Sequence, residues 1–479
     1  MRKLMFPCFG LAFILLDMPN QSLAKWNQTD IDRLIRQLGS EKFREREASS
    51  KLLEEIGTPA MESLLKERRT EDLEVRQRIA RLLEIIRPRA QAMAIATIRT
   101  LGGEFQTNSA GQVYWVSLCN TRTSDLDLTS LSYLDDIVML DLSGSKVTDA
   151  GLFYLTRLHN LQQLNLSGTR VTSRGLTHLH SLRNIRELDL STTKISDSGL
   201  RYLQGCRNIQ SLSFSDNSIS GLGLADLKGF RSLHTLDLSG TLVTNDRLAH
   251  LSYFKNLRCL NLSKTSIGDM GVFHLKFLKS LSSLNLSNTL VTDTGLVHLE
   301  NLKHLISLNL SKTQLTDSGL IHLRKLYRLV NLNLCGTEVV GSGLKHLENL
   351  TCLYCIDLSE SCLKDSGISN LNQFRTLSCL NLSRTNITNA GLANLKQLTS
   401  LNTLGLFGTF VTDIGLVQLK QLKNLNTLDI GGTQVTDAGL VHLKDLLHLQ
   451  CLGLSETKVA LPAIIELKMS LPALTDVVR

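Results

Sequence analysis

Side chains able to do chemistry recur every 24 residues along most of this sequence, with serines, aspartates and histidines each in a column of their own. The histidine column is unbroken through five units: His250, His274, His298, His322 and His346. A Ser/His/Asp triad needs its three side chains within hydrogen-bond reach. The serines follow predicted strands, whereas the histidines lie in predicted helices on the opposite side of each unit. We therefore expect no enzyme activity, and the absence of a G-x-x-x-x-G-K phosphate loop argues against a nucleotide cofactor.

Cysteines offer a second kind of chemistry, because Cys352 and Cys355 have the C-x-x-C spacing of zinc and redox sites. No matching second pair occurs, and several cysteines occupy repeat positions where other units carry Ser, Thr or an apolar residue. We expect them to act as small fillers and predict no metal site.

The elements that position these columns follow from the repeat. From about residue 113 the pattern L-x-x-L-x-L-S-x-T-x-V-T-D-x-G-L-x-x-L recurs every 24 residues without insertion, which makes 15 units. Alternation around Leu164 and Leu166 predicts a short strand with leucines inward and polar residues outward. The aspartates, such as Asp149, are expected to cap the following helix, and the glycine two residues later, such as Gly151, to allow close packing of coils. A threonine column, such as Thr169, predicts a ladder of hydroxyl bonds to the backbone of neighbouring turns.

This repeat resembles the leucine-rich-repeat family, specifically bacterial proteins with 24-residue units and Thr-Asp-x-Gly-Leu turns. The resemblance covers about three quarters of the chain and implies an α/β fold, a right-handed leucine-rich-repeat solenoid (horseshoe). Its concave parallel sheet is the family's usual binding surface, so the resemblance favours a non-catalytic scaffold for protein–protein interaction.

The segments outside the repeat predict a small all-α cap at one end and a second cap at the other. Residues 25 to 101 carry helix signals and are similar to a short HEAT-like helical pair. Ser40 is expected to cap a helix, and Pro88 to end one. The solenoid is expected over residues 102 to 459 and a C-terminal cap over residues 460 to 479, where Val459-Ala-Leu-Pro462 replaces the repeated turn.

The first 24 residues read as a cleavable export signal. Arg2 and Lys3 precede an apolar run from Leu4 to Leu16, and Ser22-Leu23-Ala24 supplies small residues for cleavage after Ala24. The run is shorter than the about 20 residues that a membrane span needs. We predict a secreted or periplasmic (cell-envelope) protein without an integral membrane span.

Departures from the repeat mark candidate binding residues on the concave face. Trp115 and Met139 are large groups at its N-terminal end, and Phe407 replaces the usual serine beside Gly405, Gly431 and Gly453 toward the C-terminal end. Phe410 is a further candidate binding residue. Acidic strand residues recur between them: Asp141, Asp189 and Asp237. Just beyond the threonine column, four successive units form a predicted basic edge: Arg122, Lys146, Arg170 and Lys194.

These residues favour a protein partner, with an anionic polymer as an alternative ligand of the basic edge. Nucleic acid is not expected, because a chain of net charge +8 carries no aromatic residues interleaved along that edge. A monomer is expected. Two other functions stay open: a structural or spacer protein without a specific ligand, and a substrate-recognition subunit similar to the repeat arm of F-box ubiquitin-ligase receptors.

Overall fold

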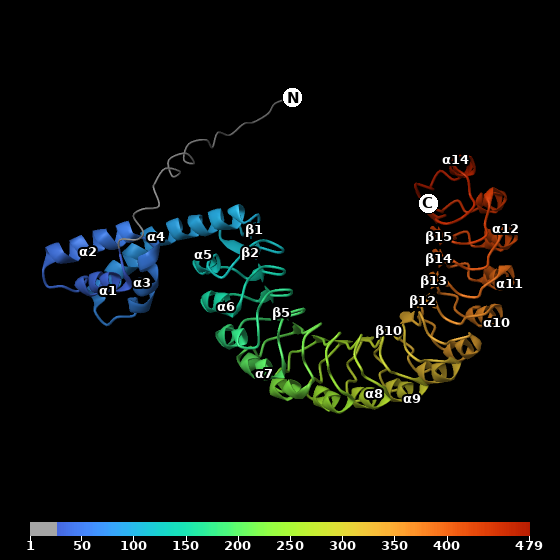
Figure 1. Cartoon of the computed structure of the whole chain (residues 1–479), viewed down its shortest axis with the longest axis horizontal. Coiled ribbons are helices and arrows are strands. Elements are labelled where there is room, and N and C mark those ends of the chain that lie inside the picture. The colour runs from blue at the N-terminus through green and yellow to red at the C-terminus, as the bar shows by residue number, and fades with distance from the viewer. Residues whose placement is uncertain (1–25) are drawn as a thin grey trace, which may run out of the picture. The chain divides into compact units, whose positions relative to one another are not determined.

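The computed structural model describes residues 26 to 479, which form two compact units (Figure 1). The predicted export signal lies outside the described residues. One unit contains residues 26 to 102 together with Leu126–Leu134, and the other contains Gly103–Asp125 and Asp135–Arg479. The chain is thus a leucine-rich solenoid with a separate helical unit.

The helical unit is built on one apolar cluster in which Leu38, Leu53, Leu64 and Ile79 are fully buried. Its elements are α1 (Gln28–Gln37), α2 (Phe43–Ile56), η2 (Thr58–Ala60), α3 (Met61–Glu67), α4 (Leu73–Thr100) and α5 (Leu128–Leu131). Asp72 caps α4 through bonds that its carboxylate accepts from the amides of Glu74 and Val75. The predicted all-helical segment is confirmed, whereas its HEAT-like character stays a prediction.

Two local predictions in the helical unit are wrong. Helix α2 begins after Lys42, which makes no side-chain cap, and the Ser40 hydroxyl instead donates to Glu45 at 2.6 Å. Helix α4 does not end at Pro88 but continues through it. Proline in a helix interior costs about 3 kcal/mol. Buried residues on both sides of Pro88, such as Ile86 and Ala90, hold the helix together by packing.

The solenoid sheet has 17 strands. They are β1 (Glu104–Thr107), β2 (Val113–Ser117), β3 (Met139–Asp141), β4 (Gln163–Asn165), β5 (Glu187–Asp189), β6 (Ser211–Ser213), β7 (Thr235–Asp237), β8 (Cys259–Asn261), β9 (Ser283–Asn285), β10 (Ser307–Asn309), β11 (Asn331–Asn333), β12 (Cys355–Asp357), β13 (Cys379–Asn381), β14 (Thr403–Gly405), β15 (Thr427–Asp429), β16 (Cys451–Gly453) and β17 (Asp476–Val478). Strands β2 to β16 are the fifteen that the repeat predicts. Each pairs in parallel with the next, for example Leu140 with Leu164.

Short helices and 3-10 turns cover the other side of each coil. They are α6 (Asp149–Leu155), η3 (Gly175–Ser181), α7 (Asp197–Leu200), η4 (Arg201–Gly205), η5 (Leu222–Leu227), η6 (Asn245–Tyr253), α8 (Asp269–Leu275), α9 (Asp293–Leu296), η7 (Val297–Leu299), η8 (Asp317–Leu323), η9 (Ser342–Leu347), α10 (Asp365–Ile368), η10 (Ser369–Leu371), α11 (Asn389–Leu392), η11 (Leu395–Gln397), α12 (Asp413–Leu416), η12 (Val417–Gln421), α13 (Asp437–Leu440), η13 (Val441–Leu443) and α14 (Leu461–Ser470). Within this unit the strands line the inner, concave side of the curve and the helices the outer side (Figure 1).

The aspartate column joins each coil to the next one. The prediction that Asp149 caps its own helix is wrong, because the N-cap of α6 is Thr148, whose hydroxyl accepts from the Ala150 amide. The Asp149 carboxylate instead accepts from the amide and the hydroxyl of Thr172, one coil later, at 2.7 and 2.6 Å. The carboxylate therefore satisfies backbone of the neighbouring coil, and the column stabilises the stacking of units.

The hydroxyls of the threonine column bond mainly to the backbone of their own coil. The Thr169 hydroxyl donates to the Leu166 carbonyl oxygen of the same turn at 2.7 Å, so the predicted bond to a neighbouring turn is wrong for this residue. Asn217, one of the exceptions in the column, does reach the preceding coil, where its amide donates to Leu190 O at 2.7 Å.

The glycine column is explained by the aspartates. A Cβ atom on Gly175 would lie 2.4 Å from Asp149 Oδ1, closer than real contacts allow. The bonds from Thr172 hold that oxygen in place. We therefore expect Gly175→Ala to lower the free energy of unfolding by about 1–3 kcal/mol, the usual cost of overpacking. Urea denaturation measures the change. Gly229→Ala is the matched control, because the nearest atom to its added Cβ is Arg207 Nε at 4.0 Å, and an equal loss in both variants would contradict the explanation.

Both ends of the sheet carry strands that the repeat does not predict. Strand β1 pairs antiparallel with β2, and Gln106 lies opposite Trp115. At the other end β17 extends the parallel ladder, with Asp476 opposite Cys451, after helix α14 has replaced the repeated turn. These two strands cover the edges of the repeat sheet, which would otherwise expose unpaired backbone groups.

Candidate partner-binding site

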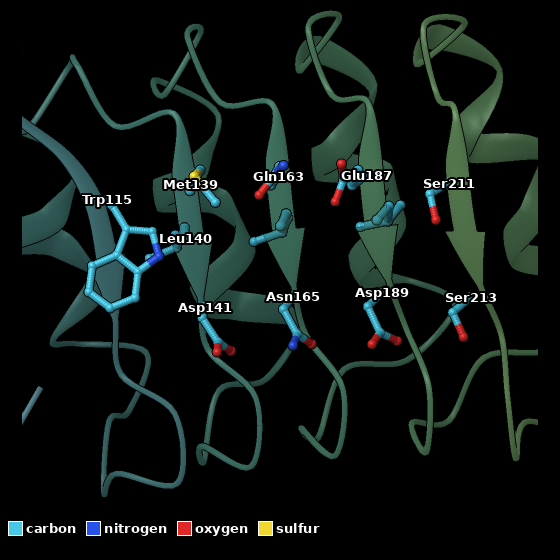
Figure 2. A pocket seen from close by; sticks show the side chains of 12 residues that line it. Trp115, Met139, Leu140, Asp141, Gln163, Asn165, Glu187, Asp189, Ser211 and Ser213 are labelled. Carbon is cyan, nitrogen blue, oxygen red and sulfur yellow. The ribbon is translucent and has the colours of Figure 1, made fainter. Parts of the chain in front are cut away.

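A shallow hollow of about 380 Å³ lies on the concave face of β2 to β6. Figure 2 shows its side chains in two rows, with Trp115 at one end. The hollow is lined by Trp115, Met139, Leu140, Asp141, Gln163, Leu164, Asn165, Glu187, Leu188, Asp189, Ser211 and Ser213. Four predicted binding residues, namely Trp115, Met139, Asp141 and Asp189, therefore lie at one site.

Register produces the two rows. Trp115 lies opposite Met139, which lies opposite Gln163, because neighbouring strands pair residues 24 positions apart. The second row follows the same rule, and Asp141 pairs with Asn165 and Asn165 with Asp189. The strand leucines between the rows point into the core, so the floor of the hollow is rigid and its polar side chains project from it.

The hollow carries negative charge from Asp141, Glu187 and Asp189. Asp141 Oδ1 accepts from the amide and the hydroxyl of Ser143 at 2.9 and 2.6 Å, which fixes the orientation of the carboxylate. Its other oxygen, Oδ2, takes no part in these bonds. None of the side chains that line the hollow is cationic. The site thus combines an aromatic ring with fixed carboxylates, which suits a cationic group on a partner.

Glu187 is the charged lining residue that the sequence reasoning missed. It occupies the strand column of Gln163 and Ser211, where a charged residue is unusual in this chain. This charged residue in an otherwise neutral column is the feature of the sequence that could have identified Glu187 as a candidate binding residue. The predicted residue Asp237 lies one strand beyond the hollow, on β7, where Asn261 Nδ2 donates to its Oδ2 at 3.1 Å.

The predicted aromatic patch near the C-terminal end contains one packed ring, Phe407, and one exposed ring, Phe410. A Cβ on Gly431 would lie 2.8 Å from Phe407 Cδ2, so the ring packs over Gly431. The Arg384 guanidinium lies 5.5 Å from the ring centroid and covers it. Phe410 is 55% exposed and belongs to the turn that follows, where its amide donates to Ile387 O.

The predicted basic edge consists of exposed residues on four consecutive coils. The side chains of Arg122, Lys146, Arg170 and Lys194 are all exposed. Backbone bonds fix their spacing, because the Lys146 amide donates to Thr123 O and the Arg170 amide to Val147 O, each at 2.9 Å. Whether these residues bind a ligand stays a prediction.

Histidines of the column contact side chains of the neighbouring coil. His322 Nδ1 lies 2.9 Å from Glu300 Oε1, and the His298 ring packs edge-on against Phe273. Over residues 26 to 479, no three His, Cys, Asp or Glu side chains are grouped as a metal site. None of the helices in this part of the chain is long and apolar enough to cross a membrane.

The cysteines differ in burial and in the pKa of their thiols. Burial raises the pKa of Cys206 to about 12, because its thiolate would be desolvated. The Cys355 thiol donates a hydrogen bond to the Cys379 sulfur, which lowers the pKa of Cys379 to about 7 and raises the pKa of Cys355. Cys352, the other member of the C-x-x-C spacing, is exposed.

We expect iodoacetamide to alkylate the native, reduced chain selectively. The exposed thiols Cys119, Cys352 and Cys362 should react in the folded chain, whereas Cys206 should react only after unfolding, because its burial excludes the reagent and disfavours the nucleophilic thiolate. Peptide mass spectrometry at successive times measures each rate. Alkylation of Cys206 in the folded chain at the rate of Cys352 would contradict its burial.

The repeats match known sequence families. The family described as "Leucine rich repeat" matches residues 183–243, and a second one of the same description matches residues 301–323, 375–396 and 421–443. None of the curated proteins matches the chain as a sequence relative.

Solved structures share the fold at low sequence identity. A leucine-rich-repeat protein from Leptospira interrogans has a TM-score of 0.55 and 21% identity, over 72% of this chain and 91% of that one. A chain of the mouse RP105/MD-1 complex has a TM-score of 0.51 and 21% identity, over 71% of this chain and 67% of that one. The functional domain of InlJ from Listeria monocytogenes, which includes a cysteine ladder, has a TM-score of 0.50 and 16% identity, over 74% of this chain and 71% of that one. With the repeat matches and the fifteen stacked coils, these likenesses show that the chain contains leucine-rich repeats and has the leucine-rich-repeat fold.

Proposed function

We propose that this chain is a non-catalytic scaffold that binds a protein partner through the concave face, at the hollow beside Trp115. The observation that carries the proposal is the meeting of Trp115 with the carboxylates of Asp141, Glu187 and Asp189 around one hollow. A lysine or arginine of the partner would lie against the indole beside Asp141, and a second basic side chain would reach Glu187 and Asp189, three strands beyond the indole. The contact with the indole contributes about 0.5–2 kcal/mol, depending on how much water it excludes.

The placement of the hollow supports protein recognition. It spans β2 to β6, and the same sheet continues over further strands that a long partner segment can follow. Interface energy concentrates in a few aromatic and charged residues surrounded by neutral contacts. The short polar side chains next to Trp115, such as Gln163 and Asn165, fit that surrounding role.

The solved structure of the mouse complex is consistent with this proposal, because a chain with a similar fold is seen there in a complex. We further propose that the chain acts as a monomer and is exported, with cleavage after Ala24. We propose that the segments over residues 25 to 101 and 460 to 479 serve as caps of the solenoid.

Affinity capture tests the proposal against the spacer alternative. The chain from Lys25 onward is the bait, beside a variant carrying Trp115→Ala and Asp189→Asn. A partner held by the parent and lost by the variant supports recognition at the hollow. The matched control is Asp429→Asn, because Asp429 occupies the same strand position as Asp189 far from the hollow and also accepts a bond from the amide two residues on. Equal capture by parent and variant would favour a spacer.

A further inference from the structure

Two cysteines face one another on the concave sheet, well away from the hollow. Cys355 of β12 and Cys379 of β13 are partners in the parallel register. Neighbouring strands lie about 4.8 Å apart, which sets the separation of the two Cα atoms. Residues paired in a parallel register project from the same face of the sheet, so the two cysteine side chains lie side by side. Both side chains are half-buried and remain open to solvent.

The surroundings of the pair favour a cation. The Asp357 carboxylate, two residues after Cys355, raises the pKa of both thiols, because its negative charge opposes a thiolate; the same charge attracts a positive ion. The flanking residues in the same row are the neutral Asn331 and Thr403, so no cationic side chain stands in register beside the pair. A positive ion between the sulfurs would be attracted by the carboxylate and repelled by neither neighbour.

The number of ligands decides which cation fits. Thiolate ligands select soft ions, chiefly Cu(I), zinc and iron–sulfur clusters. Structural zinc takes four protein ligands, and iron–sulfur clusters are likewise held by four. In the part of the chain that the structure describes, no third His, Cys, Asp or Glu joins the two cysteines as a ligand group. Cu(I) is the soft ion whose coordination two sulfur atoms can complete.

We propose that Cys355 and Cys379 form a two-sulfur site on the concave face that binds one Cu(I) ion. The ion takes the place of the shared hydrogen bond: the thiol protons leave to solvent, and each sulfur donates an electron pair to copper without any change of oxidation state. The site is separate from the hollow of β2 to β6, and it does not depend on the function proposed for that hollow.

Competition with a coloured Cu(I) chelator tests the site. The full, reduced chain is titrated with Cu(I) alone, without oxygen, beside Cys355→Ser and Cys379→Ser. Each single variant should bind Cu(I) more than about 100-fold more weakly, because losing a ligand costs more than losing an outer partner. Serine is suited to these positions because Ser283 and Ser307 occupy the same strand column, and circular dichroism checks that the variants fold.

Matched controls separate this site from general thiol binding. Cys352→Ser and Cys362→Ser remove exposed cysteines and should leave the affinity of the Cys355/Cys379 site unchanged. Binding by the Cys355→Ser/Cys379→Ser double variant at parental affinity would overturn the proposal. So would equal weakening in the Cys352→Ser control, or displacement of Cu(I) by an equal concentration of zinc.

Discussion

Replacing Leu308 by alanine is expected to lower the free energy of unfolding by about 2–5 kcal/mol. Leu308 is 1% exposed and lies between Leu284 and Leu332, its register partners on β9 and β11. The variant loses the burial of the side chain and leaves a cavity that neighbouring leucines cannot fill, because the hydrogen-bonded ladder fixes the spacing of the coils. Urea denaturation followed by circular dichroism measures the loss.

Leu290→Ala is the control for this prediction. Leu290 is 55% exposed. Its amide donates a hydrogen bond to Ile267 O, and an alanine at this position retains that backbone bond. We expect a change within about 0.5 kcal/mol. In a solenoid each repeat contacts its neighbours only, so the Leu308 cavity should also split unfolding into two steps around the damaged coils. Similar losses in both variants would contradict the assignment of the core.

Replacing Trp115 by alanine is expected to weaken binding of the proposed partner by about 2 kcal/mol, which raises the Kd about 30-fold. The half-buried indole is the largest side chain that lines the hollow, and its loss removes the contact to a cation while the carboxylates remain. Surface plasmon resonance with a partner obtained by capture measures the change in affinity, and the melting temperature is measured in parallel.

Tyr253→Ala is the matched control for Trp115. Tyr253 is an aromatic residue that is 47% exposed, and it ends η6 on the helical side of its coil. Its removal should leave the affinity unchanged. If Trp115→Ala retains parental affinity, or if Tyr253→Ala loses as much, the partner does not use the hollow.

The solenoid was predictable because every coil repeats the same buried pair. Leucines such as Leu164 and Leu166 identify the strand, and the constant period of 24 fixes the register, so β2 to β16 follow from sequence alone. Sequence reasoning did not find β1 and β17, because neither belongs to the repeat and each is a strand only through pairing with its neighbour. Pro88 failed as a helix end for a related reason: packing outweighed a local tendency.

The candidate site was predictable where a residue departs from the repeat in size, as Trp115 and Met139 do. Glu187 was missed because its column was not read as a surface row. The cysteines were likewise interpreted from their spacing within one unit, because Cys352 and Cys355 match a C-x-x-C motif. The period of 24 instead places Cys355 beside Cys379. Spacing along one coil is the weaker guide in a solenoid, because register brings residues of successive coils together.

The most direct test of the account is the fluorescence of Trp115 during peptide binding. Trp26 and Trp115 are the two tryptophans of the chain, so Trp26→Phe leaves Trp115 as the single reporter. The variant is titrated with a pool of random peptides rich in lysine and arginine, and with a pool of equal length rich in aspartate and glutamate. We predict that the basic pool shifts the emission, that the acidic pool does not, and that Asp141→Asn/Asp189→Asn removes the response. An unchanged emission with both pools, or an equal shift with both, would contradict recognition of a cationic partner at the hollow.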